Sequence, residues 1–131
     1  MSVNKYTFSK NIYLDFDEAI DAVIHALKIE GFGVLTDIDV TATIKNKLNI
    51  DIEPYRILGV CNPLFVHEAI ITDASIGALL PCNVVVRKAH DNGINVEFMD
   101  PESVLGIVSD PKITEIGKKV KSKLKRVMNT L

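Results

Sequence analysis

Cys61 stands at the junction of a predicted strand and a predicted helix, where a thiol can do chemistry. The strand spans residues 55–61, and Asn62-Pro63 combines a favourable helix N-cap with proline at the first helical position. Free backbone N–H groups and the positive end of a helix dipole stabilise a thiolate or another anion. Arg56 would add positive charge, but strand alternation places it on the opposite face from Cys61. Both a packed, inert cysteine and an activated one fit this pattern.

The second cysteine, Cys82, follows a proline in an apolar stretch, residues 78–88, that is otherwise typical of a strand. Because Pro81 cannot donate to a strand ladder, we expect an edge strand, a bulge or an interrupted ladder here, and such irregularities border functional sites. If the two cysteine strands are neighbours, Cys82 approaches Cys61. The pair would then serve redox chemistry or, with His67, form a soft-metal site.

The histidines indicate a functional site less strongly than the two cysteines do, and the common catalytic and binding motifs are missing from the sequence. The sequence contains no C-x-x-C and no H-x-x-x-H spacing, so we expect no metal and no cofactor. His25 and His90 are expected at the surface, whereas His67 is near enough to Cys61 in sequence to form a thiolate–imidazole pair. No nucleotide-binding loop, nucleophile elbow or EF-hand loop is present. The sequence does not decide whether the protein is an enzyme.

The elements that must position these residues follow from hydrophobic periodicity. Period-two alternation predicts strands over residues 6–12, 33–39, 55–61, 78–88 and 93–99, the third of them interior because both its faces are mostly apolar. Helical stripes predict helices over residues 15–30, 40–48, 63–71 and 111–128, with a short helical turn after Asp100-Pro101. This order predicts an α+β domain with a mostly antiparallel sheet and the helices packed on one face.

Composition and charge predict one domain over residues 1–131. The chain is 47% hydrophobic and 24% charged and shows no repeat or linker. Its net charge of −2 argues against a general nucleic-acid binder. The charge is uneven, because residues 111–131 hold seven basic and one acidic side chains, whereas residues 1–110 hold eight basic and 16 acidic ones. We expect the lysines of the last helix to form a solvated face, with an acidic partner, nucleic acid or an anionic membrane as alternatives.

The sequence also predicts a cytoplasmic protein without a membrane segment. There is no run of about 18 apolar residues, the length that suggests a membrane span. Residues 1–10 alternate polar and apolar side chains, unlike the apolar stretch of a signal peptide. Two unpaired cysteines fit a reducing compartment.

The two cysteine segments resemble the domain-of-unknown-function family number 302. The resemblance rests on Leu-Gly-Val-Cys-Asn-Pro in residues 58–63, on Leu-Leu-Pro-Cys-Asn-Val-Val-Val in residues 79–86 and on Asp100-Pro101, and it covers nearly the whole chain. It implies a TATA-binding-protein-like fold, with a strand, a helix, four antiparallel strands and a C-terminal helix, and it implies a homodimer. It also makes the motif residues candidates for a shared ligand site: Arg56, Cys61, Asn62, Pro63, Pro81, Cys82 and Asn83.

Three functions remain open at this point. The preferred one is a small-ligand-binding module that acts as a homodimer and holds its ligand between the sheet and the last helix. It predicts that some apolar positions of residues 111–128 line a cavity. The first alternative is a thiol-dependent redox or metal-binding protein that uses Cys61 and Cys82. The second is an interaction protein whose lysine-rich last helix docks an acidic partner.

Overall fold

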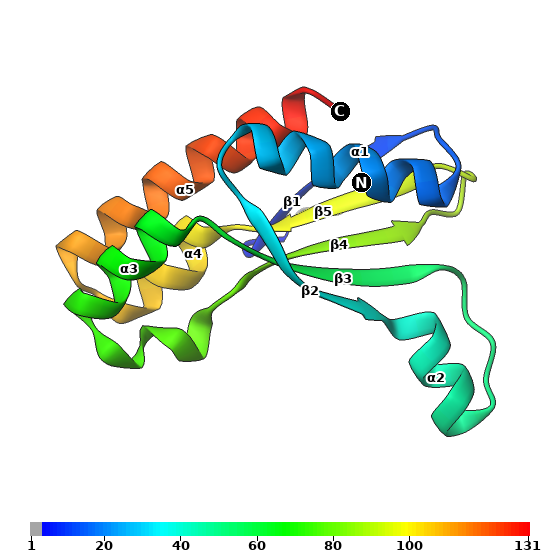
Figure 1. Ribbon diagram of the computed structural model, residues 1–131, viewed down its shortest axis with the longest axis horizontal. Helices are drawn as coiled ribbons and strands as arrows, with labels where there is room; N and C mark the ends of the chain where they lie inside the picture. Colours follow the sequence, from blue (N-terminus) through cyan, green and yellow to red (C-terminus); the bar gives the residue numbers. More distant parts are fainter. Residues whose placement is uncertain (1–3) are drawn as a thin grey trace.

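The computed structural model describes residues 4–131, in which five strands form one antiparallel sheet of order β1-β5-β4-β3-β2 (Figure 1). The strands are β1 (Thr7–Ile12), β2 (Gly33–Asp39), β3 (Tyr55–Cys61), β4 (Cys82–Lys88) and β5 (Ile94–Met99). The helices are α1 (Phe16–Ile29), α2 (Val40–Leu48), α3 (Pro63–Thr72), α4 (Pro101–Leu105) and α5 (Pro111–Asn129), with short 3-10 helices η1 (Ala74–Leu79) and η2 (Gly106–Val108). The predicted α+β class and antiparallel sheet are confirmed. None of the helices in this part of the chain combines the length and apolar character that crossing a membrane requires.

The core lies between one face of the sheet and the helices α1 and α5. Alternate strand residues such as Leu58, Val84 and Phe98 pack in one cluster with Leu27 of α1 and Leu124 of α5, and all five are fully buried. Burying one such side chain stabilises the fold by about 1.5–3 kcal/mol. The other alternate positions of the strands carry more polar side chains, so one face of the sheet holds the core, as the alternation predicts.

The structure corrects the predicted strand over residues 78–88. The carboxylate of Asp73 accepts a hydrogen bond from the backbone N–H of Ser75 at 3.0 Å and starts η1, so β4 begins only at Cys82. Pro81, which has no N–H, therefore lies just outside the ladder. Because β4 pairs with both β3 and β5, it is interior, and neither an edge strand nor a bulge is found. Of the three predicted irregularities the interrupted ladder is the one observed, since the pairing begins only at Cys82. The interior position predicted for β3 is confirmed.

Helix α2 and the loop after it, residues 40–52, form an arm that projects beyond the ends of β2 and β3 (Figure 1). Asp39 caps the helix by accepting a hydrogen bond from the Ala42 N–H at 2.9 Å. The Thr41 hydroxyl accepts a hydrogen bond from the Tyr55 N–H at 2.9 Å, which ties the base of the arm to β3. None of the residues of α2 is buried. The arm is thus fixed by hydrogen bonds at its base and not by packing against the core.

Candidate functional site

Cys61 and Cys82 line the same small hollow beneath α3 and α5. They come together because β3 and β4 are neighbours, with Val60 opposite Cys82 in the ladder. The hollow has a volume of about 20 Å³, since Ile116 and Val120 of α5, only 4% and 6% exposed, fill the space between helix and sheet. A space of this size holds about one water molecule and no organic ligand. The predicted ligand cavity under the last helix is therefore wrong.

The buried thiol of Cys82 is unsuited to the proposed thiol chemistry. Burial disfavours the thiolate and, together with the nearby Cys61, raises the pKa of Cys82 to about 12. At pH 7 Cys82 is therefore protonated, whereas the thiolate is the form that attacks a disulfide. His67 is exposed on α3 and does not line the hollow. Within residues 4–131 no group of three or more His, Cys, Asp or Glu side chains is placed to hold a metal ion.

The other predicted site residues are dispersed. Arg56 lies at the opposite end of β3 from Cys61, where its guanidinium donates hydrogen bonds to Asp37 of β2, and this interaction raises the pKa of Arg56. Asn83 is exposed, and neither it nor Pro81 lines the hollow. Asn62, which with Pro63 begins α3, does line it. The structure thus brings Asn62 and the two cysteines together and leaves Arg56, Pro81 and Asn83 outside.

Several cations of α5 are engaged within the chain. Lys121 pairs with Asp100 at 2.9 Å, and Arg126 pairs with Glu30 at 3.0 Å. The ammonium nitrogen of Lys125 lies 4.5 Å from the centre of the ring of Phe8 in β1. The two ion pairs join α5 to the acidic part of the chain, as a solvated face predicts, and they reduce the positive charge available to an acidic partner.

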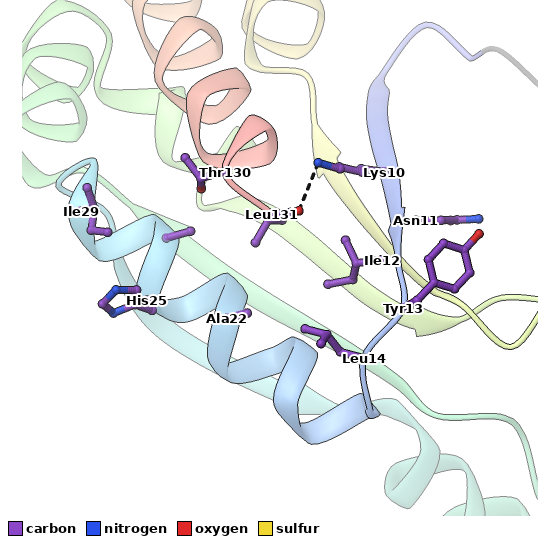
Figure 2. A pocket seen from close by; sticks show the side chains of 11 residues that line it. Lys10, Asn11, Ile12, Tyr13, Leu14, Ala22, His25, Ile29, Thr130 and Leu131 are labelled. Atoms are coloured by element: carbon purple, nitrogen blue, oxygen red, sulfur yellow. Dashed lines mark hydrogen bonds between the residues drawn. The ribbon is translucent and has the colours of Figure 1, made fainter.

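A wide groove, which the sequence did not indicate, lies between the end of β1, one side of α1 and the end of α5 (Figure 2). Its volume is about 630 Å³. Figure 2 shows Ile12, Leu14 and Leu131 in the space between β1 and α1. Most of the lining is apolar and comes from Ile12, Tyr13, Leu14, Ala22, Ala26, Ile29 and Leu131. A ligand in this groove would contact segments from both ends of the chain.

Small side chains on α1 and a lysine on β1 shape the groove. Ala22 and Ala26, four residues apart, lie on one side of α1, where their methyl groups leave space that larger side chains would fill. Lys10 and Ile12 are two residues apart on one strand, so their side chains point to the same side of β1. This is the side that the helices cover, because Ile12 belongs to the core. The ammonium of Lys10 donates a hydrogen bond to the main-chain oxygen of Leu131 at 3.1 Å (Figure 2). This bond holds the end of α5 against β1 and puts a cation at the groove.

Comparison with known proteins assigns the chain to a family. No protein with a curated description matches it. The crystal structure of an uncharacterized conserved DUF302 protein from Bacillus stearothermophilus is similar, with a TM-score of 0.89 and 27% sequence identity over 96% of this chain and 98% of that chain. Residues 8–131 match the family model described as Domain of unknown function DUF302. The resemblance of the two cysteine segments is thereby confirmed, and the chain belongs to the DUF302 family.

Proposed function

We propose that the protein is a small-ligand-binding module that acts as a homodimer, with the ligand in the groove between β1, α1 and the end of α5. The observation that carries the proposal is the size of the groove. Its volume of about 630 Å³ lies within the range of about 300–1,000 Å³ typical of ligand pockets. Its apolar walls supply the driving force, because an apolar ligand that leaves water for such a surface gains free energy.

The groove is a better candidate than the cysteine site for two physical reasons. The hollow at Cys61 and Cys82 has a volume of about 20 Å³, which excludes an organic ligand. The raised pKa of Cys82 also makes it a poor resolving thiol for redox chemistry.

Binding in the groove can be tested with the neutral fluorophore N-phenyl-1-naphthylamine, which brightens in apolar surroundings. We expect a saturable rise in fluorescence with the wild-type protein. Ala22→Leu, which puts a larger side chain on the groove wall, should weaken binding at least tenfold. The matched variant Ala78→Leu changes an exposed alanine of η1 and should bind as wild type does. Binding that does not saturate, or that Ala22→Leu leaves unchanged, would overturn the groove as the ligand site.

The homodimer is favoured by the exposed apolar surface of the arm. Leu48 and Ile50 of the arm are 60% and 52% exposed, and Ile38 of the adjoining β2 is 49% exposed. A helix of nine residues is only marginally stable in water unless an apolar side is packed. Exposed apolar patches of this kind mark interaction surfaces. We therefore infer that the arm is covered by a partner.

A second copy of this chain fits the arm because the exposed surface of the arm is apolar and can cover itself. The charges near the patch are largely compensated within the chain, because Lys45 of α2 pairs with Asp51 of the arm at 3.1 Å and Asp37 of β2 pairs with Arg56. In a two-fold dimer the same patch meets itself. The exposed apolar side chains on the arm of one protomer can then cover those of its partner, twice about one axis. We expect an interface of about 1,200–2,000 Å², the usual size for a stable complex.

The dimer is tested by the mass of the protein in solution. Light scattering after gel filtration should give twice the chain mass of 14.5 kDa for the wild type. Leu48→Asp should give the single-chain mass, because a carboxylate would be buried in the interface. The matched variant Ile107→Asp, at a 73% exposed position of η2, should remain dimeric. A monomeric wild type would exclude the dimer, and a dimer that survives Leu48→Asp would exclude the arm as its interface.

A further inference from the structure

Helix α3 presents a second exposed apolar surface. Leu64 and Ile71 are each 65% exposed, although Ala69 of the same helix is buried in the core. Because Leu64 and Ile71 are seven residues apart, about two helical turns, they lie on one side of α3. Exposed apolar side chains in such a row mark an interaction surface. We call this side, with Glu68 between the two apolar residues, the outer side of α3.

The outer side of α3 and the arm lie near opposite ends of β2 (Figure 1). The arm begins at Val40, directly after the last residue of β2. At the first residue of β2, Gly33 is opposite Cys61 in the ladder, and α3 begins two residues after Cys61. Within the described sheet β2 is an edge strand. Two apolar surfaces thus flank one uncovered edge, about 20 Å apart along a strand of this length.

Two-fold symmetry brings these two surfaces together. An axis through the middle of β2 reverses the direction of the strand, so it places the arm of each protomer beside α3 of its partner, twice in one dimer. The arm alone, residues 40–52, offers fewer residues than the about 20–30 that a stable interface uses on each side. The ten residues of α3 bring the surface close to that size. The bulge between Val34 and Thr36 breaks the regular edge of β2, so helices are better placed than a strand ladder to make the contact.

Charges on the two helices are complementary. Ile44 is three residues before Lys47 and four before Leu48, so these residues share one side of α2. This side carries a lysine among apolar residues, whereas the outer side of α3 carries Glu68 among apolar residues. The ion pairs formed within residues 4–131 include neither Lys47 nor Glu68. Each helix therefore offers the charge that the other lacks.

We propose that the arm of each protomer packs on the outer side of α3 of its partner, with Leu48 against Leu64 and Lys47 paired with Glu68. The inference rests on the homodimer proposed above and names the surface that the arm covers. Both exposed helices then lose their contact with water in the same dimer, which a contact between two arms alone would not achieve.

Leu64→Asp tests the α3 side of this contact. Leu64 is the second residue of α3, where a carboxylate is stabilised by the positive end of the helix dipole, so the variant should fold with the circular dichroism of the wild type. Light scattering after gel filtration should give the single-chain mass of 14.5 kDa, because a carboxylate would be buried in the interface. The control Ile107→Asp, at an exposed position of η2, should remain dimeric.

The outcomes separate the α3 contact from the dimer itself. A dimeric Leu64→Asp beside a monomeric Leu48→Asp would exclude α3 and leave the arm as the interface. If both variants are dimeric, or if the wild type is monomeric, the homodimer through the arm is lost and the α3 contact with it.

Charge reversal tests whether the two helices face each other. Lys47→Glu and Glu68→Lys should each raise the dissociation constant of the dimer about tenfold, because two contacts between like charges form in each dimer. The double variant restores opposite charges and should dissociate within about twofold of the wild type. Lys112→Glu, at an exposed lysine of α5, should have no effect. A double variant that dimerises no better than the single variants would exclude the pairing of α2 with α3.

Discussion

Gly117 of α5 lies against the backbone of α4, and its replacement by alanine tests how close the two helices are. A Cβ atom at this position would stand 2.9 Å from the carbonyl oxygen of Pro101 and 3.3 Å from the Cα of Glu102, whereas ordinary contacts begin near 3.4 Å. Both atoms belong to the backbone, so no side-chain rotation can relieve the contact. Gly117→Ala would therefore push α4 and α5 apart by a few tenths of an ångström.

Two effects of Gly117→Ala oppose each other. Alanine stabilises a helix interior by about 1 kcal/mol relative to glycine. Overpacking of a well-packed contact costs about 1–3 kcal/mol. Separation of the helices would also lengthen the 2.9 Å contact between Lys121 and Asp100, which joins α5 to the start of α4. We therefore expect the clash to prevail, with a net loss of about 1 kcal/mol in the free energy of unfolding.

Urea unfolding followed by circular dichroism measures this change. The midpoint for Gly117→Ala should fall while the slope stays the same. In the control Gly106→Ala the added Cβ meets no atom within 4 Å, so the free energy of unfolding should change by less than about 0.5 kcal/mol. A Gly117→Ala midpoint at or above that of the wild type would show that helix propensity prevails. The close approach of α4 and α5 would then not limit this position.

Three further predictions concern single side chains. Iodoacetamide at pH 8 should modify Cys82 far more slowly in the folded than in the unfolded protein, because its pKa is raised to about 12; equal rates by mass spectrometry would contradict this. The Asp91 carboxylate accepts hydrogen bonds from the Gly93 N–H and the Tyr13 hydroxyl, which lower its pKa below 3.8. Because the pKa of Asp91 is lower in the folded than in the unfolded protein, the ionised carboxylate stabilises the fold above about pH 4. This contribution is lost as the pH falls through the pKa of the folded protein. Tyr13→Phe should raise that pKa in an NMR titration, and an unchanged value would refute the role of the hydroxyl. Asp100→Ala removes both the acceptor that caps α4 and the ion-pair partner of Lys121. We expect the free energy of unfolding in urea to fall by about 2 kcal/mol. A loss below about 0.5 kcal/mol would contradict this role of Asp100.

Most elements were predictable because their signals are local. The apolar spacing that predicts a helix over residues 15–30 is the spacing of the residues that α1 buries, such as Val23 and Leu27. The apolar character of both faces of residues 55–61 predicted an interior strand, which β3 is. The prediction failed at residues 78–81, where the apolar pattern continues but the Asp73 carboxylate starts η1 and β4 begins only at Cys82.

The site was less predictable because it depends on volumes and on distant segments. The sequence indicated that Cys61 and Cys82 would approach each other if their strands were neighbours, and the ladder makes them so. It could not show that Ile116 fills the space beside them. The groove draws on residues 10–14, 22–29 and 130–131, none of which forms a recognisable motif. Only the packing of β1 against α1 and the end of α5 reveals it.

The pairing of β1 with β5 sets the order in which the groove can form during synthesis. Within the described sheet β1 is an edge strand whose neighbour is β5, with Thr7 opposite Met99 and Ile12 opposite Ile94. A ribosome that adds about 5–20 residues per second makes β1 roughly 4–17 seconds before it makes β5. The first strand must therefore remain unpaired while the helices and the other strands are translated. The end of α5, which forms another side of the groove, is translated later still. The groove can therefore form only after all five strands of the sheet have been made.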